Sequence, residues 1–588
     1  MEALDRLEKH WRWWLLLVWL ATAGLLIFTR WAQIQSFGLG DTDDNLRIMQ
    51  VRDLLRGQNW FDLRQYRLNP PEGADIHWSR IVDLPIAGIK LALAPLLGGA
   101  AAERWAVAAA PLLPLLVAMA AIAVTARRLI SPLAFALAIA ILLCGHSVRN
   151  QFVPLRIDHH GWQLAMLAVA VMALTDAKRA RGGAILGAAT AFSLAIGLEM
   201  LLYLALAGAA AVLMWVHDQG QARRLAAYGA SLAGGTGLGY LLFASQANRA
   251  PVCDALSPVW LSAMVGAGAV CVLLSLLPRR GPLVRFAAAA GGGVLIAAFF
   301  AWAWPHCLGR LEGVSAEADR LWLSNVREAR PIYMHGWRTA TTILALPVFG
   351  LIGYALMLWR TRRDLPRFIP WAAAAAPALL AVLLLLWQSR AGPAAQLLAV
   401  AGASGLAWAA IVAVRGSRFM LVRVIGTVLA FLLISGLLLQ QAVELFPAPK
   451  AKSSPAVARA NGTCPTMAAL RPIALQPKGY VLTHVDLGPR LIAVTHHSAV
   501  AGPYHRNHRD IVDTMRAFRG SAEDAQPMIA RRRIDYVLIC PNLSETTIYA
   551  TQAKNGFYVQ LVRGRVPAWL EPVALPAKSP YRMWRVKR

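Results

Sequence analysis

The feature that most constrains this chain is a series of long apolar runs separated by short polar loops. About 13 runs approach the 17 to 25 residues that cross a bilayer as a helix. They lie near residues 13–30, 104–126, 131–145, 161–176, 183–197, 200–217, 225–243, 257–277, 284–304, 340–359, 369–387, 394–414 and 420–440. Only 15% of the 588 residues are charged, against roughly a quarter in soluble domains. The sequence predicts a polytopic α-helical membrane protein.

The basic residues predict how the chain is oriented. The net charge of +28 comes mainly from short loops between the apolar runs, at residues 127–128, 178–181, 223–224, 279–280, 360–367 and 415–418. Lys and Arg concentrate in cytoplasmic loops of membrane proteins, so this pattern indicates membrane topology and argues against a nucleic-acid partner. We expect a multi-pass protein of the bacterial inner membrane with a cytoplasmic N-terminus and a retained first helix.

This orientation places the polar loops on one face of the membrane. The loops 37–80, 244–256 and 305–338, the segment 158–160 and the C-terminal part all fall on the periplasmic side. Residues 84–98 are apolar but short. Successive loops alternate between the cytoplasmic and periplasmic sides only if these residues form an interfacial or re-entrant helix instead of crossing the membrane. We therefore divide the chain into a transmembrane module, residues 1–440, whose first periplasmic loop with its interfacial helix covers 37–103, and a periplasmic domain, 441–588.

The C-terminal domain begins after a Pro- and Ser-containing linker at residues 447–455. Residues 479–485, 491–495 and 536–539 favour strands, whereas 510–518 and 522–533 favour helices. The alternation predicts a small α/β domain.

The cysteines fit an oxidising compartment. Cys253 and Cys307 lie in two periplasmic loops, and Cys464 and Cys540 lie in the C-terminal domain. We predict the disulfides Cys253–Cys307 and Cys464–Cys540, although spacing alone does not fix connectivity.

An acidic stretch follows the first apolar run. Asp41, Asp43 and Asp44 crowd together where a membrane-spanning segment meets water. Carboxylate oxygens suit a hard divalent cation such as Mg²⁺ or Mn²⁺. The alternative is a solvated loop, or ion pairs with Arg47 and Arg52, and for this stretch alone the two interpretations are about equally good.

Two further polar segments lie on the same predicted face. Asp158, His159 and His160 precede an apolar run, where a carboxylate and an imidazole two residues apart can share a metal ion. Taken alone, Asp158 is better explained as a helix N-cap. Glu328 lies between Arg327 and Arg330 and, taken alone, is better explained by a salt bridge with a neighbouring Arg. Acids from three distant loops on one membrane face nevertheless favour a metal-assisted active site there.

The order of these features resembles the GT-C superfamily of polyprenyl-phosphate-dependent glycosyltransferases, and within it the catalytic subunit of oligosaccharyltransferase. In that family an acid–x–acid motif followed by Gly stands where residues 158–161 stand here, with His160 replacing the second acid. The family's first-loop Asp, followed by Arg, resembles Asp41 or Asp43 with Arg47. Its later Glu before a Pro resembles Glu328.

The resemblance implies a set of roles. The catalytic residues would be Asp41, Asp43 and Glu328; the ligands of Mn²⁺ or Mg²⁺ would be Asp43, Asp158 and His160; the donor phosphate would bind Arg47, His77 and Arg80; and the acceptor would bind Asp486, Tyr504, His505 and Arg506. Which first-loop Asp binds the cation and which acts on the acceptor stays open.

The family's C-terminal signature marks a departure. Its tryptophan-tryptophan-aspartate motif would fall at residues 484–488, where Asp486 and Gly488 are present and both tryptophans are absent. In the family this motif recognises the hydroxy amino acid of a protein acceptor, so we expect a glycan or lipid acceptor before a protein. The predicted function is transfer of a sugar or oligosaccharide from a polyprenyl-phosphate or -diphosphate carrier to an acceptor at the periplasmic face.

Two other classes of protein remain possible. A lipid-linked sugar flippase or transporter would need ionisable residues at mid-membrane depth and matching halves, neither of which is apparent. A non-catalytic envelope assembly protein would not need the acidic loops. We favour the transferase.

Overall fold

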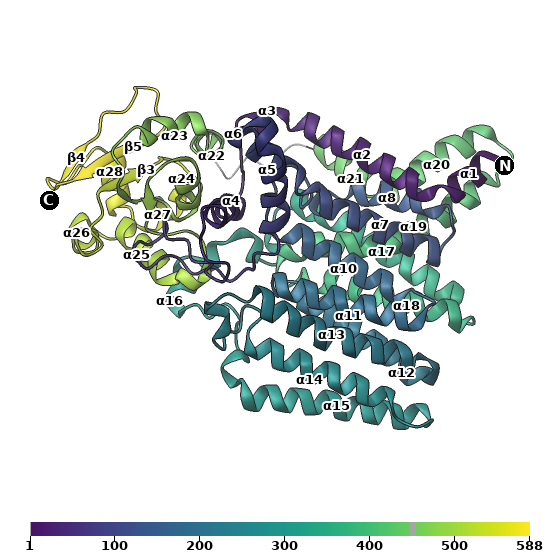
Figure 1. Ribbon diagram of the computed structural model, residues 1–588. Helices are drawn as coiled ribbons and strands as arrows, with labels where there is room; N and C mark the ends of the chain where they lie inside the picture. The colour runs from purple at the N-terminus through teal and green to yellow at the C-terminus, as the bar shows by residue number, and fades with distance from the viewer. Residues whose placement is uncertain (1, 447–453, 588) are drawn as a thin grey trace.

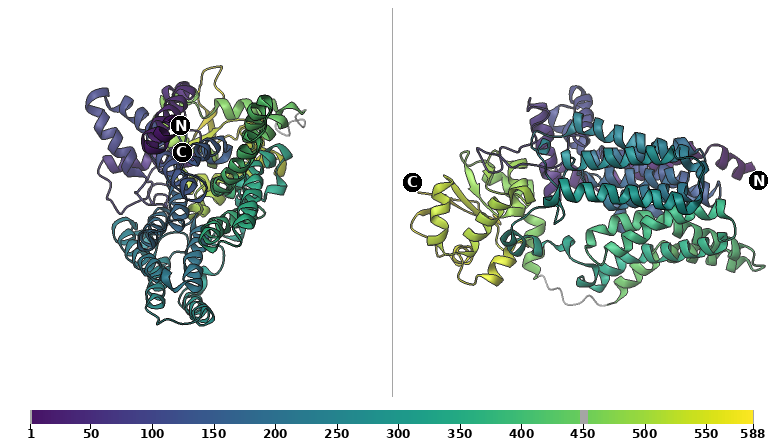
Figure 2. Two further views of the ribbon diagram at one scale, coloured as in Figure 1. Left: turned by 90° about the vertical axis from the view of Figure 1, so that its right-hand side faces the viewer. Right: turned by 90° about the horizontal axis from the view of Figure 1, so that it is seen from below.

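The computed structural model describes residues 2–446 and 454–587, so most of the predicted linker lies outside the described residues. Long helices run side by side in a bundle, and a smaller α/β unit covers one end of it (Figure 1). The two chain ends lie at opposite ends of the molecule, as the view from below also shows (Figure 2). This separation is what a cytoplasmic N-terminus and a periplasmic C-terminal domain would require.

All 13 predicted apolar segments are helical in the structure. In the described residues, seven helices are long and apolar enough to cross a membrane: α2 (Trp11–Thr29), Gly99–Leu129, which joins α6 (Gly99–Ala109) to α7 (Leu112–Leu129), α14 (Pro258–Ser275), α15 (Pro282–Ala303), α17 (Trp337–Thr361), α18 (Leu365–Leu384) and Ser389–Arg415, which contains α19 (Gly392–Arg415). The chain is thus a multi-pass membrane protein, and the count of about 13 crossings stays a prediction.

An eighth span is possible at α20 (Met420–Ile434) and α21 (Leu437–Leu445). These two helices meet at an angle of 80°. The bend has a local cause, because Gly436 between them has a φ of +80°, which L side chains rarely adopt.

The remaining helices of the bundle are shorter or less apolar. They are α1 (Glu2–Lys9), α8 (Ala134–Cys144), α9 (His146–Arg149), α10 (His160–Leu174), α11 (Arg179–Ile196), α12 (Leu201–His217) and α13 (Ala222–Phe243).

The segment predicted to be interfacial forms α5 (Asp83–Leu97). Gly98, with a φ of +78°, ends this helix, and α6 packs beside it. Leu91 and Leu96 of α5 are 59% and 80% exposed. An apolar surface of this kind suits the membrane boundary.

The C-terminal unit contains a five-stranded sheet with strand order β2-β1-β3-β5-β4. Its strands are β1 (Tyr480–Leu482), β2 (Ser498–Ala499), β3 (Tyr536–Ile539), β4 (Leu570–Pro572) and β5 (Arg582–Val586). β1 pairs in parallel with β2 and β3, and β5 is antiparallel to β3 and β4. Its helices are α22 (Pro455–Thr463), α23 (Met467–Ala474), α24 (Gly488–Val494), α25 (His508–Arg519), α26 (Ala522–Arg531), α27 (Thr546–Gln552) and α28 (Phe557–Val562). The predicted α/β unit is present.

One predicted strand is wrong. Residues 491–495 were expected to be extended, but residues 488–494 form α24. Pro489 lies at the first turn of this helix, where proline favours helix initiation. A helix here also provides the crossover that the parallel strands β1 and β2 require.

The first loop is built into the C-terminal unit. The predicted helix after the acidic stretch is α4 (Thr42–Leu55), and its side chains Leu46 and Met49 share one hydrophobic core with Leu491 and Ile492 of α24. The backbone N–H of Ala499 in β2 donates to the carbonyl of Arg67 at 2.9 Å. The first loop and the C-terminal domain therefore form one packed layer over the end of the bundle.

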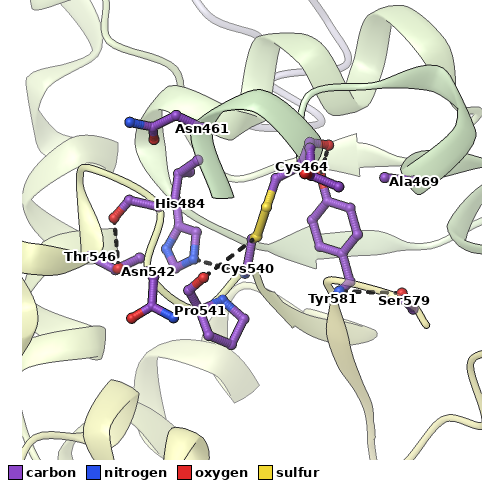
Figure 3. The surroundings of a disulfide bond; sticks show 12 residues. Asn461, Cys464, Ala469, His484, Cys540, Pro541, Asn542, Thr546, Ser579 and Tyr581 are labelled. Carbon is purple, nitrogen blue, oxygen red and sulfur yellow. Dashed lines mark hydrogen bonds between the residues drawn. A yellow bond between two sulfur atoms is a disulfide. The ribbon is translucent and has the colours of Figure 1, made fainter. Parts of the chain in front are cut away.

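Both predicted disulfides are confirmed. The Cα atoms of Cys253 and Cys307 are 5.4 Å apart, and those of Cys464 and Cys540 are 6.5 Å apart. Figure 3 shows the second bond beside the rings of His484 and Tyr581. It ties the start of the C-terminal domain to the end of β3.

Candidate active site

The acidic stretch begins helix α4. Asp41 is its N-cap residue, and its Oδ1 accepts a hydrogen bond from the backbone N–H of Asp43 at 3.0 Å. The alternative pairing predicted from the sequence is wrong, because Arg47 pairs with Asp83 and Arg52 pairs with Glu103. The first-loop acids are therefore left for other partners.

Arg156 joins the first-loop acids to the segment before α10. Its guanidinium nitrogens lie 2.5 Å from Asp41 Oδ2 and 2.6 Å from Asp158 Oδ2. Asp44 is buried, and its Oδ1 accepts the backbone N–H groups of Ile157 and Asp158 at 2.8 and 3.1 Å. Residues more than 110 positions apart in the sequence thus form one cluster.

Asp158 also organises the start of α10. Its Oδ2 lies 3.0 Å from Nδ1 of His160, and its Oδ1 accepts the backbone N–H of His160. The N-cap position belongs to His159, which makes no capping bond through its side chain. The capping interpretation is thus partly right. The carboxylate of Asp158 accepts a free backbone N–H at the start of α10, and it also faces the acidic cluster.

His159 turns the other way. Its Nε2 lies 2.9 Å from Oε1 of Glu199, and its ring packs on Trp78 with centroids 5.0 Å apart. These contacts fix the backbone at His159, between Asp158 and His160.

The cluster crowds several carboxylates together. Burial and the neighbouring carboxylate of Asp41 raise the pKa of Asp43 to about 8. Burial disfavours ionisation of Asp158 as well, but Arg156 and His160 outweigh it and hold its pKa below the ordinary value. Among the described residues Asp43 has no ion-pair partner within 4.0 Å. Crowded carboxylates, with one imidazole beside them, are donors of the type that a divalent cation accepts.

A recess opens beside this cluster. It is small, with a free volume of about 10 Å³, and is bordered by Arg156 and Asp158 on its polar side. Ile86, Pro114 and Trp162 are among the apolar residues that line the rest of it. The polar cluster therefore adjoins an apolar surface that faces the bundle.

The C-terminal domain contributes Asp486 to the same region. Its side chain is exposed to solvent yet surrounded by protein, and this environment together with nearby Asp41 raises its pKa to about 6. The turn Val485–Leu487 that carries Asp486 follows the buried imidazole of His484. The position of the absent tryptophan signature thus still presents a carboxylate to the first-loop acids.

The residues expected to bind the donor phosphate already bind other groups of the protein. Arg47 is fully buried, with Nη1 2.8 Å from Asp83 Oδ1, and Arg80 lies 3.4 Å from the other oxygen of Asp83. His77 accepts the indole N–H of Trp78 through Nε2 at 2.8 Å. These contacts build the first loop, and the cation that faces the acids is Arg156.

The residues expected to hold the acceptor instead join the two parts of the chain. Arg506 binds Asp254 through two nitrogens, at 2.8 and 2.7 Å, and His505 Nε2 lies 2.6 Å from the same carboxylate. The hydroxyl of Tyr504 donates to the carbonyl of Thr42 at 3.0 Å. Asp486 remains the C-terminal side chain that is open to an acceptor.

Among the described residues, His77, Asp254 and His505 are possible metal ligands whose ligand atoms lie within 4.8 Å of one another, a spacing that Asp43, Asp158 and His160 do not reach. Both oxygens of Asp254 already bind Arg506, and His77 Nε2 already accepts a hydrogen bond. This group satisfies itself without a metal ion, so the acids around Asp43 are the better candidate.

Glu328 lies apart from these contacts. It belongs to the short 3₁₀ helix Arg327–Ala329, and its side chain is exposed. Its backbone carbonyl accepts the hydroxyl of Ser389 at 3.2 Å. In the described residues, no ion pair joins the side chain of Glu328 to the acidic cluster.

The sequence interpretation missed several residues of the site. Arg156, Glu199 and Asp254 were not assigned roles, although each is a charged residue beside an apolar run or a cysteine. Such residues are costly near a membrane unless they are paired, and that cost is the signal that identifies them.

Comparison with known proteins identifies the fold. No protein-family model and no curated protein matches the chain. The Archaeoglobus fulgidus oligosaccharyltransferase AglB, in complex with an inhibitory peptide and a dolichol-phosphate, aligns with a TM-score of 0.67 at 16% identity, over 96% of this chain and 73% of that one. The enzyme tethered to a peptide containing the NVT sequon aligns with a TM-score of 0.63 at 15% identity, over 95% and 72%.

A third structure of the Archaeoglobus fulgidus oligosaccharyltransferase, a complex with zinc and sulfate, aligns with a TM-score of 0.56 at 16% identity, over 85% of this chain and 64% of that one. At these identities the likeness establishes the architecture and no more. The chain has the GT-C fold of the archaeal oligosaccharyltransferase.

Proposed function

We propose that this protein is a membrane glycosyltransferase that moves a sugar or oligosaccharide from a polyprenyl-phosphate or -diphosphate carrier to an acceptor at the periplasmic face of the bacterial inner membrane. The observation that carries the proposal is that Arg156 bridges Asp41 and Asp158, with Asp43 and the C-terminal Asp486 nearby, at the covered end of a GT-C bundle. The AglB structures, which contain a dolichol-phosphate or zinc, support a lipid carrier and a cation for this chain.

The cation would be held by Asp43, Asp158 and His160, with Mn²⁺ or Mg²⁺ as the ion. When bound, it neutralises charge that develops on the departing phosphate. Arg156 keeps the carboxylates of Asp41 and Asp158 on either side of one guanidinium.

The transfer exchanges one bond for another at the anomeric carbon. The acceptor oxygen bonds to this carbon while the bond to the carrier phosphate breaks, and the phosphate leaves with the bonding electrons. Asp41, at the N-cap of α4 and 40% exposed, would take the proton of the acceptor hydroxyl. Glu328 would approach from the exposed loop 305–338 when substrate binds.

The acceptor class follows from the C-terminal domain. Tyr504 joins the domain to the first loop, and His505 and Arg506 join it to Asp254 in the loop 244–256. Asp486 alone does not reproduce a site for the hydroxy amino acid of a peptide. We propose a glycan or lipid acceptor.

Carrier release from defined donors tests the proposal. Purified protein in detergent would receive polyprenyl-phosphate and polyprenyl-diphosphate sugars, with Mn²⁺ or with EDTA, together with hydroxyl-bearing glycosides as acceptors. We expect one donor class to release its carrier at least about tenfold faster with Mn²⁺. Release that is equally fast in EDTA would contradict the metal site, and no release from any donor by folded protein would contradict the transferase.

A further inference from the structure

Glu545 is a buried carboxylate that no role assigned so far uses. Its Oε1 accepts the backbone N–H of Val485 at 2.9 Å, and its Oε2 accepts the backbone N–H of Asp486 at 2.8 Å. The hydroxyl of Tyr549 donates to Oε1. The side chain is 5% exposed, so nearly all of its hydrogen-bonding capacity is directed at the turn that carries Asp486.

The same turn is fixed at both ends. Before it, Nε2 of His484 accepts the backbone N–H of Cys540 at 3.1 Å. After it, Gly488 approaches the carbonyl of Ala501 so closely that a Cβ atom there would lie 2.0 Å from the oxygen. The backbone of Asp486 is therefore immobilised while its side chain stays open to solvent.

The geometry requires a carboxylate. Two neighbouring N–H groups point at the two oxygens of Glu545, and a glutamine would offer an oxygen to only one of them. The choice has a cost, because burial and the charge of Asp486 raise the pKa of Glu545 to about 8. A buried acid beside another acid is costly, and here both of its oxygens hold the turn that carries Asp486.

We propose that Glu545 is a positioning residue that sets the carboxylate of Asp486 toward the first-loop acids, where Asp486 accepts a hydrogen bond from a hydroxyl-bearing acceptor. This inference rests on the proposed transferase function. Asp486 is the group that would touch the acceptor, and Glu545 acts through it. An anionic acceptor of hydrogen bonds selects for hydroxyl donors and against anionic groups.

The first test measures the turn without any substrate. Amide hydrogen exchange would follow the peptide that covers Val485 and Asp486 in wild type, Glu545→Gln and the control Glu523→Gln, an exposed glutamate of α26. We expect exchange at this peptide to quicken about tenfold or more in Glu545→Gln alone. Exchange that does not change in Glu545→Gln would overturn the positioning role.

The second test measures transfer, with n-octyl β-D-glucoside as the acceptor and the donor found by carrier release. We expect Glu545→Gln to raise the KM for the glucoside about tenfold, with less than about a twofold change in kcat and in the KM for the donor. An unchanged KM for the glucoside, or a wild type that releases carrier yet never glycosylates it, would overturn the inference. A wild type that releases no carrier would instead refute the proposed function itself.

Discussion

Replacing Asp158 with alanine should reduce sugar transfer by at least about 1000-fold, equivalent to about 4 kcal/mol of transition-state stabilisation. The substitution removes a proposed ligand of the cation and a partner of both Arg156 and His160. Product formation from the lipid-linked donor, normalised to folded protein, measures the loss.

The same helix supplies a matched control. Asp176, just beyond the far end of α10, is also buried and pairs with Arg128 and Arg181. Asp176→Ala should therefore lose ion pairs of the same kind while keeping transfer within a few-fold of wild type. Activity of Asp158→Ala within tenfold of wild type, or an equal loss in Asp176→Ala, would show that Asp158 has no special part in the reaction.

Replacing Asp83 with alanine should destabilise the protein by about 3–5 kcal/mol. Asp83 is fully buried between Arg47 and Arg80, whose side chains are at most 1% exposed. Removing the carboxylate leaves two buried guanidinium groups without their counter-ion. The free energy of unfolding, measured by denaturant titration in detergent, reports the effect.

The exposed ion pair between Asp319 and Arg310 is the comparison for this prediction. Its side chains are 39% and 65% exposed, and exposed pairs contribute about 0–1 kcal/mol. Asp319→Ala should therefore cost less than about 1 kcal/mol. If Asp83→Ala is no less stable than Asp319→Ala, the buried cluster does not hold the first loop in place.

Much of the fold could be predicted from the local composition of the sequence. Apolar runs predict helices because a membrane leaves the backbone few alternatives, and the structure is helical at each of them. The disulfides Cys253–Cys307 and Cys464–Cys540 were predictable because the predicted topology places both members of each pair on the same side of the membrane. Residues 491–495 were mistaken for a strand because a short buried helix and a short buried strand have the same apolar pattern.

The site was only partly predictable. Topology alone brings the loops of Asp43, Asp158 and Asp486 to one face, and the structure places these residues in one region. The partner of each charge was not predictable, since Arg156 meets Asp41 from 115 positions away in the sequence. Arg47 looked free because its partner Asp83 lies beyond an intervening loop.

The binding of Mn²⁺ tests the central claim most directly. Isothermal titration would compare wild type with Asp43→Asn, Asp158→Asn and the control Asp176→Asn. We predict one ion per chain in wild type and in the control, and at least about tenfold weaker binding in each of the other two variants, because ligands from both segments are needed. Binding that is unchanged in either Asp43→Asn or Asp158→Asn would contradict a single metal site built from these two distant segments.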